Sequence, residues 1–192
     1  MQNRSLPLLV LCMLSIGVPV FAQQPPSPDS FQYLFPKPTG KNGYEELVFA
    51  SVLLNRNEEA KKIFTESSPP LTEIRRLFKM PDVMHARDLF YIGIRKRISI
   101  PRDPQELDEN TRFPEFAEFR SYARFHAKEI YLALADGKNS EAIEALRTGL
   151  QFGHQIQMQT IIAGLVGIAI DAIVLRPFDG TLEVLSVKDC LT

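Results

Sequence analysis

Two histidines and one aspartate are the residues of this sequence best suited to catalytic chemistry. His154 follows Leu146 on the same helical face, and burial on an apolar face lowers the pKa of an imidazole, which leaves a neutral base or ligand. Asp171 is the only charged residue between positions 156 and 175, where a carboxylate requires a partner or a polar pocket. Asp171 with His154 or His126 is therefore the candidate catalytic set, and it indicates a hydrolase.

A structural interpretation of the same residues is favoured over the catalytic one. A histidine at the edge of a helical core commonly hydrogen-bonds a backbone carbonyl, and one perturbed group is weak support for an active site. Asp171 would be a polar contact between helices if it pairs with Arg124 or with a charged His126. Glu129 has the geometry of the second carboxylate that such catalysis usually needs, although its spacing does not single it out.

The sequence lacks the common catalytic and ligand-binding motifs. It has no HExxH motif or cysteine cluster for a metal, and no GxSxG, P-loop or dinucleotide-binding glycine pattern. The acidic residues between 103 and 109 lack the alternating spacing of a calcium loop. If the two helices that carry the histidines form a hairpin, His126 faces Gly149 and His154 faces Ser121, too far apart along the axis to share a metal. We therefore expect no metal and no cofactor.

The length and composition indicate a single soluble domain without an excess of basic charge. The chain has 192 residues, of which 45% are hydrophobic, and 22 Lys and Arg balance 23 Asp and Glu. Without an excess of basic charge, nucleic acid is excluded as an expected partner. Cys12 and Cys190 are the only cysteines, and once a leader containing Cys12 is removed, Cys190 cannot close a disulfide within its own chain. The sequence assigns no role to Cys190, and stability must come from packing.

The N-terminal segment has the features of a cleavable signal peptide. Arg4 precedes an uncharged, mostly apolar run from Leu6 to Phe21, and Ala22 completes a small-x-small cleavage pattern. Residues 1–22 are therefore predicted to direct export, to the periplasm or outside the cell. The next twenty residues, 23–42, are rich in proline and are predicted to form a flexible linker.

Residues 43–192 are predicted to form one all-α domain built from antiparallel helical hairpins. Apolar side chains recur at steps of three and four, and Pro and Gly interrupt them at intervals. Pro81 is expected to stop one helix and Asp82 to cap the next. The helix that begins near Pro114 has apolar residues on two faces and is expected to lie at the centre. The predicted helices cover 44–54, 58–65, 71–78, 82–97, 114–134, 140–154 and 156–175, with a surface loop over 98–112.

The segment Ile156–Leu175 admits two interpretations. It is apolar almost all round, which is typical of the central helix of a soluble domain. It also has the length of a membrane span, and Ala163 and Gly167 make a small-xxx-small pair. Gln157 and Asp171 argue against a span, so we favour a buried helix and a mature chain that does not span the membrane.

Part of the sequence resembles a known type of protein. The segments Tyr131–Lys138, Ser140–Leu146 and Leu165–Asp171, within Ala123–Asp171, resemble a family of uncharacterised exported bacterial proteins built from helical hairpins. The middle also resembles the second helix of a tetratricopeptide repeat, with Ala142, Leu146 and Gly149 at the small, large and small positions, but no second copy follows at a period of about 34 residues. The resemblance implies a hairpin fold and no particular activity. Ser186–Asp189 looks like a capping box without a helix after it, as expected if the domain is truncated at its C-terminus.

These observations favour an exported, non-catalytic module that binds a protein or a cell-envelope component in a groove between hairpin helices. Two alternatives stay open. One is an exported hydrolase that uses Asp171 with His154 or His126. The other is a membrane-anchored protein held by residues 156–175.

Overall fold

The computed structural model describes residues 42–101, 112–157 and 160–179, and within these ranges the chain is helical without a strand. The all-α prediction is confirmed. The predicted signal peptide, nearly all of the linker, the acidic loop residues, Ser186–Asp189 and Cys190 lie outside the described residues. The helices are α1 (Tyr44–Arg56), α2 (Glu58–Thr65), α3 (Leu71–Leu77), α4 (Pro81–Ile94), α5 (Glu115–Ala135), α6 (Asn139–Gln157) and α7 (Ile161–Leu175), followed by the short 3₁₀ helix η3 (Arg176–Phe178).

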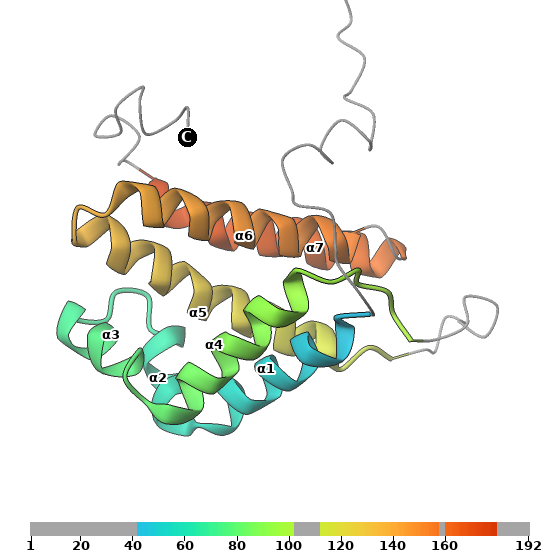
Figure 1. The fold of residues 1–192 in the computed structure, drawn as a ribbon, viewed down its shortest axis with the longest axis horizontal. Helices are drawn as coiled ribbons and strands as arrows, with labels where there is room; N and C mark the ends of the chain where they lie inside the picture. The colour runs from blue at the N-terminus through green and yellow to red at the C-terminus, as the bar shows by residue number, and fades with distance from the viewer. Residues whose placement is uncertain (1–41, 102–111, 158–159, 180–192) are drawn as a thin grey trace, which may run out of the picture.

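Helix α5 lies at the centre, as its two apolar faces predict. It contacts α1, α2 and α3 on one side and α6 and α7 on the other. In Figure 1, α6 and α7 run side by side along one edge of the molecule, and α1 to α4 lie across α5 from them. The fold is thus a layer of two long helices and a layer of four shorter ones, joined through α5.

Aromatic side chains hold the two layers together. Tyr122 of α5 is completely buried and stacks on Phe90 of α4, with ring centroids 4.4 Å apart. Phe152 of α6 meets the edge of Phe90 at 5.3 Å and of Phe119 at 5.5 Å. Because edge-to-face and offset arrangements are the preferred geometries of aromatic pairs, this cluster fixes α4, α5 and α6 relative to one another.

The start of α4 differs from the prediction. Pro81 does not end the preceding helix; it is the first residue of α4, and Asp82 lies inside the first turn rather than capping it. Proline suits this position because the first-turn N–H has no helical acceptor and the fixed φ is already helical. The helix also ends at Ile94, three residues before the predicted end.

The predicted helix 156–175 is wrong in its bounds and in its burial. Ile156 belongs to α6, and α7 begins at Ile161 after Thr160, whose hydroxyl oxygen accepts from the Ala163 N–H at 3.0 Å. The apolar residues on both sides gave no sign that one helix ends and another begins here, whereas Thr160 is a residue type that commonly caps a helix N-terminus. Nor is α7 buried all round, since one of its faces is exposed. By length and hydropathy, Ile161–Phe178 could cross a membrane, and 33% of it is buried in the domain.

The inward face of α6 also differs from the prediction. Leu146 and His154, expected inside, are half-buried, and the buried residues include Ala145, Gly149 and Gly153. A Cβ atom on Gly149 would lie 2.9 Å from Val174 Cγ1 and 3.0 Å from His126 Cδ2. The hairpin register that places His126 opposite Gly149 is therefore confirmed. Small residues form this face because they let α6 approach α5 and α7 closely.

Candidate functional site

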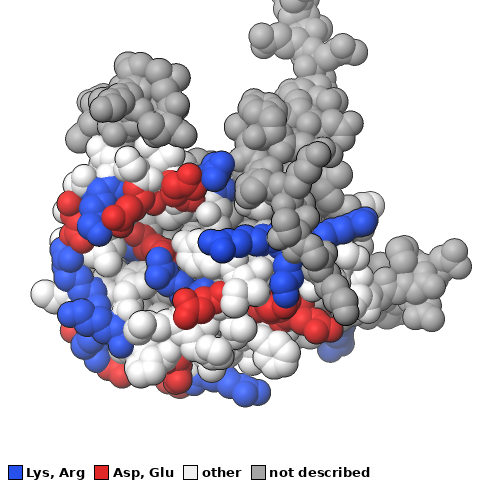
Figure 2. Space-filling view, in the orientation of Figure 1, with Lys and Arg blue, Asp and Glu red and all other residues white. Residues whose placement is uncertain are grey.

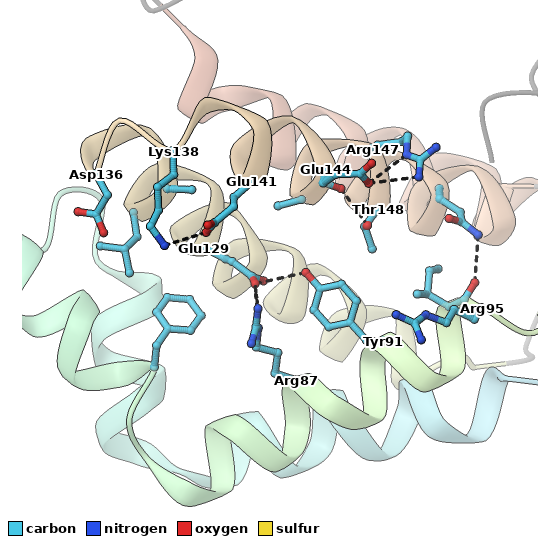
Figure 3. A pocket seen from close by; sticks show the side chains of 16 residues that line it. Arg87, Tyr91, Arg95, Glu129, Asp136, Lys138, Glu141, Glu144, Arg147 and Thr148 are labelled. Carbon is cyan, nitrogen blue, oxygen red and sulfur yellow. Dashed lines mark hydrogen bonds and ion pairs between the residues drawn. The ribbon is translucent and has the colours of Figure 1, made fainter. Parts of the chain in front are cut away.

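A cleft of about 710 Å³ opens between α4 and α6, with α5 as its floor. Figure 3 shows Arg87 and Tyr91 projecting from α4, with Arg95 directly after it, on one side and charged residues of α6 on the other. At one end, the Gln151 side chain donates to the Ile94 carbonyl at 3.0 Å and so connects α6 to the end of α4. The lining residues are Phe78, Arg87, Tyr91, Ile94, Arg95, Glu129, Leu132, Ala133, Asp136, Lys138, Glu141, Glu144, Ala145, Arg147, Thr148 and Gln151.

Most charges on the walls of the cleft are paired with each other. On α6, Lys138 lies 3.0 Å from Glu141, and Arg147 lies 3.2 Å from Glu144. Arg95 differs: it is exposed, and no carboxylate of the described residues pairs with it. On the face of the molecule in Figure 2, acidic and basic side chains are interspersed rather than separated by sign. Among the described residues, Arg95 is therefore available to bind an acidic ligand, while most other charged side chains of the cleft are paired with a residue of opposite charge.

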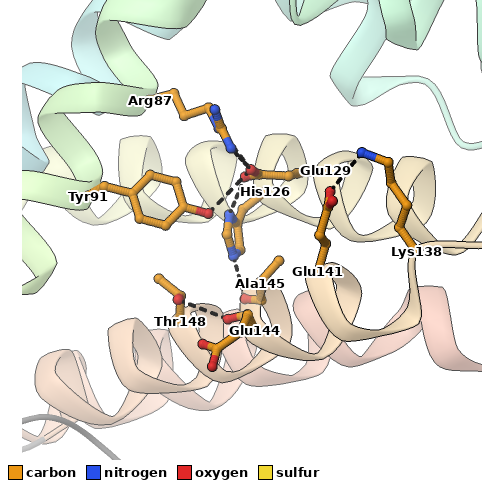
Figure 4. A network of polar contacts seen from close by, with 9 residues as sticks. All are labelled: Arg87, Tyr91, His126, Glu129, Lys138, Glu141, Glu144, Ala145 and Thr148. Carbon is orange, nitrogen blue, oxygen red and sulfur yellow. Dashed lines mark hydrogen bonds and ion pairs between the residues drawn. The ribbon is translucent and has the colours of Figure 1, made fainter. Parts of the chain in front are cut away.

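Glu129 on the floor of the cleft is the centre of a polar network (Figure 4). Its Oε1 accepts from Arg87 Nε at 2.8 Å and lies 3.3 Å from the Tyr91 hydroxyl, and Arg87 also stacks over the Tyr91 ring at 5.3 Å. Its Oε2 lies 3.2 Å from His126 Nδ1. Burial opposes ionisation of Glu129, but contacts with His126 and Arg87 outweigh burial and lower its pKa. The carboxylate thus ties α4 to α5.

His126 is enclosed in the core and contacts α6 through one ring nitrogen. This side chain is 1% exposed, and Nε2 lies 2.7 Å from the Ala145 carbonyl oxygen. A carbonyl can only accept, so Nε2 carries a proton. Nδ1 lies 3.2 Å from Glu129 Oε2, but the two atoms do not have hydrogen-bond geometry. His126 is thus built into the core.

Asp171 lies between α6 and α7, outside the lining of the cleft. Its Oδ2 accepts from Gln157 Nε2 at 2.7 Å, while its Oδ1 is buried without a hydrogen-bond partner among the described residues. Burial raises the pKa of Asp171 to about 6, and the hydrogen bond from Gln157 partly offsets this effect. The expected partners, Arg124 or His126, do not contact it.

The three candidate residues are not gathered into one site. Within the described ranges, no hydrogen bond or ion pair joins Asp171 to His126 or His154. His154 is half-buried on α6, and burial lowers its pKa as its position predicts. None of the three lines the cleft.

The network around Glu129 is what sequence reasoning missed. The i, i+3 spacing of His126 and Glu129 was a readable signal, because such residues are neighbours on a helix. Arg87 and Tyr91 had no signal, because only the packing of α4 on α5 brings them to Glu129. Among the described residues, no group of three or more His, Cys, Asp or Glu side chains could hold a metal ion.

Over the described residues, the protein is an all-α helical bundle with a cleft between α4 and α6. Comparisons of the chain with protein-family models, with curated proteins and with solved structures find no match.

Proposed function

We propose that this chain is an exported, non-catalytic binding module that holds an extended segment of a partner protein in the cleft between α4 and α6. The carrying observation is the cleft itself, about 710 Å³ in volume and lined by side chains of α4, α5 and α6. The resemblance of Ala123–Asp171 to exported proteins built from helical hairpins is consistent with the same proposal. Grooves between helices are common binding sites for peptides.

The lining indicates the chemistry of the ligand. Phe78, Tyr91 and Leu132 give the cleft apolar and aromatic contact surface, which carries much of the affinity in protein recognition. Arg95 adds a guanidinium without a carboxylate partner, and this group binds carboxylates in a two-pronged geometry. A polypeptide with an acidic residue next to apolar ones fits these features.

Selection of peptides from a random displayed library, followed by calorimetry, tests the proposal. The selected peptides should combine an acidic residue with apolar ones. Their affinity should fall at least tenfold in the variants Arg95→Glu and Thr148→Trp, which change the charge and the width of the cleft. Lys62→Glu makes the same charge change on α2, outside the cleft, and should leave affinity unchanged. Equal affinity in Thr148→Trp would place the ligand elsewhere.

The exported hydrolase is a second candidate because Asp171 has a raised pKa and an unpartnered oxygen. Both properties suit a carboxyl group that exchanges a proton near neutral pH. Turnover of ester or peptide substrates that Asp171→Asn abolishes, in a variant that stays folded, would support this candidate. Absence of turnover in both proteins supports the binding module.

Export and a membrane anchor are tested on the protein recovered from its cells. Cleavage as proposed gives an N-terminus at Gln23, readable by N-terminal sequencing. Recovery of the chain without detergent supports a soluble module. Recovery in detergent alone would favour the membrane-anchored alternative, with Ile161–Phe178 as its span.

A further inference from the structure

Helix α7 carries half of the large apolar side chains that the described domain leaves exposed. Five of the ten large apolar side chains that are exposed in the described ranges lie on this helix, with exposed fractions between 44% and 88%. They are Ile161, Ile162, Leu165, Ile168 and Leu175. On the opposite side, Ala163, Val166, Gly167, Ile170 and Val174 are buried against the rest of the domain. The helix therefore has two apolar faces, and its own domain covers one.

The spacing on the exposed face is that of a coiled-coil seam. Ile161, Leu165, Ile168, Ala172 and Leu175 follow each other at steps of four, three, four and three. All five are exposed. A strict repeat of this kind averages 3.5 residues and keeps a narrow stripe in contact with another helix along its length. We call these five residues the α7 seam.

We propose that the α7 seam binds the α7 seam of a second copy of this chain, antiparallel, about a two-fold axis close to Ile168. Such an axis places Ile168 against Ile168 of the second copy and Ile161 against Leu175 of the second copy. It also places the large Leu165 against the small Ala172 of the second copy, so that a protrusion meets a recess. A parallel pairing would set two alanines opposite each other and leave a gap, which costs packing.

The area and charge of the face suit a second copy. The exposed side chains of α7 present on the order of 600 Å² per copy, so complete coverage of this face in two copies would bury about 1,200 Å², the lower end of stable specific interfaces. No charged residue belongs to the seam. Asp171, the one charged residue of the helix, is directed to Gln157 of its own domain, so pairing buries no new charge.

Sedimentation of the protein expressed from its full coding sequence tests the pairing. The wild-type protein should sediment as a dimer at micromolar concentration. Ile168→Glu should raise the dimer dissociation constant at least a hundredfold, with an unchanged circular dichroism spectrum because this side chain is 60% exposed. Phe49→Glu alters an equally exposed apolar residue on α1, 67% exposed, and should leave the dimer intact. A wild-type monomer throughout the concentration range would overturn the proposal.

The orientation has its own tests. Ala172→Leu should weaken an antiparallel dimer at least tenfold, because the new side chain collides with Leu165 of the second copy, whereas it would tighten a parallel dimer by filling the gap. In a chain in which Cys12 and Cys190 are serine, Ile168→Cys should form a disulfide-linked dimer on oxidation. Ile161→Cys should crosslink only when mixed with Leu175→Cys. Self-crosslinking at Ile161 would overturn the antiparallel arrangement.

A lipid surface is the competing occupant of this face. Flotation with phosphatidylcholine vesicles distinguishes the two: a chain that floats through the seam, loses flotation in Ile168→Glu and never dimerises would overturn the proposal in favour of lipid. The cleft between α4 and α6 shares no residue with the seam, so peptide binding and dimerisation can fail independently.

Discussion

At the scale of single residues, Glu129 is a mostly buried carboxylate that contacts basic side chains of two helices. It is 14% exposed, and it is the shared partner of Arg87 and His126. Glu129→Gln removes the carboxylate that Arg87 and His126 both contact, and the His126 side chain is only 1% exposed. Removal of one partner from such a buried network is costly, although the partial exposure of Arg87 reduces the effect. We expect a loss of about 2 kcal/mol in the free energy of unfolding.

Urea denaturation followed by circular dichroism measures this loss. Glu144→Gln is the matched control, because it removes the same charge from an i, i+3 pair whose two side chains are 48% and 63% exposed. Such surface pairs contribute about 0–1 kcal/mol. Equal stability of the two variants would show that Glu129 is not part of a buried network.

The raised pKa of Asp171 predicts how the free energy of unfolding depends on pH. Its pKa in the folded protein is raised from 3.8 to about 6, so the folded state holds this proton more tightly than the unfolded state does. Stability contributed by the protonated form is present below pH 4 and is lost as pH rises toward 6. Asp171→Asn cannot ionise and should therefore be more stable than wild type at pH 7.5 by about 1–2 kcal/mol, a value reduced for partial solvent exposure.

The comparison of unfolding free energies at pH 4 and pH 7.5 isolates this group. Other titrating residues affect both proteins alike, so the difference between variant and wild type reports Asp171 alone. That difference should be near zero at pH 4 and should appear between pH 4 and pH 6. A gain of the same size at both pH values would contradict the raised pKa.

At the scale of helices, the contact between α6 and α7 depends on glycine. A Cβ on Gly153 would lie 2.0 Å from Asp171 Oδ1 and 3.0 Å from the Gly167 carbonyl oxygen. Gly153→Ala must therefore separate the two helices, and overpacking of this kind typically costs about 1–3 kcal/mol. The cost exceeds the gain of about 1 kcal/mol that alanine brings to a helix interior, so the variant should have a lower thermal midpoint.

Gly164→Ala is the matched control for the helix effect. A Cβ there has only the Gln157 carbonyl oxygen nearby, at 3.8 Å, which is ordinary contact. This variant should be more stable than wild type by about 0.5–1 kcal/mol. If both alanine variants raise the midpoint, helix propensity rather than close packing governs this interface.

The sequence was informative about helices and less so about their faces. Periodicity predicted α2 to the residue and placed α5 at the centre, because its large apolar side chains cover two sides. It failed on α6, where large residues such as Leu146 suggested the buried face but small ones such as Ala145 and Gly149 occupy it. A hydrophobic pattern is dominated by large apolar side chains. Close contact between two helices instead favours small residues, which such a pattern does not mark. The site shows the same limit, since Arg87 reaches Glu129 only through tertiary packing.

At the scale of the whole molecule, the cleft and the α7 seam are separate surfaces of one domain. The cleft is formed mainly by α4, α5 and α6, whereas the seam consists of exposed residues of α7, none of which lines the cleft. A dimer through the seam therefore keeps two clefts open. A partner that carries two copies of a cleft-binding segment would engage both at once.

This arrangement gives a prediction that joins the two proposals. A peptide with two cleft-binding segments on a linker long enough to span the dimer should bind about 10²–10⁴ times more tightly than the single segment, because the second binding event becomes intramolecular. Calorimetry on Ile168→Glu should show the single-segment affinity unchanged and the extra affinity lost. A gain that persists in this variant would show that the second segment binds elsewhere on the same copy. If no gain appears in a wild-type protein that sediments as a dimer, the two clefts face directions that one chain cannot span.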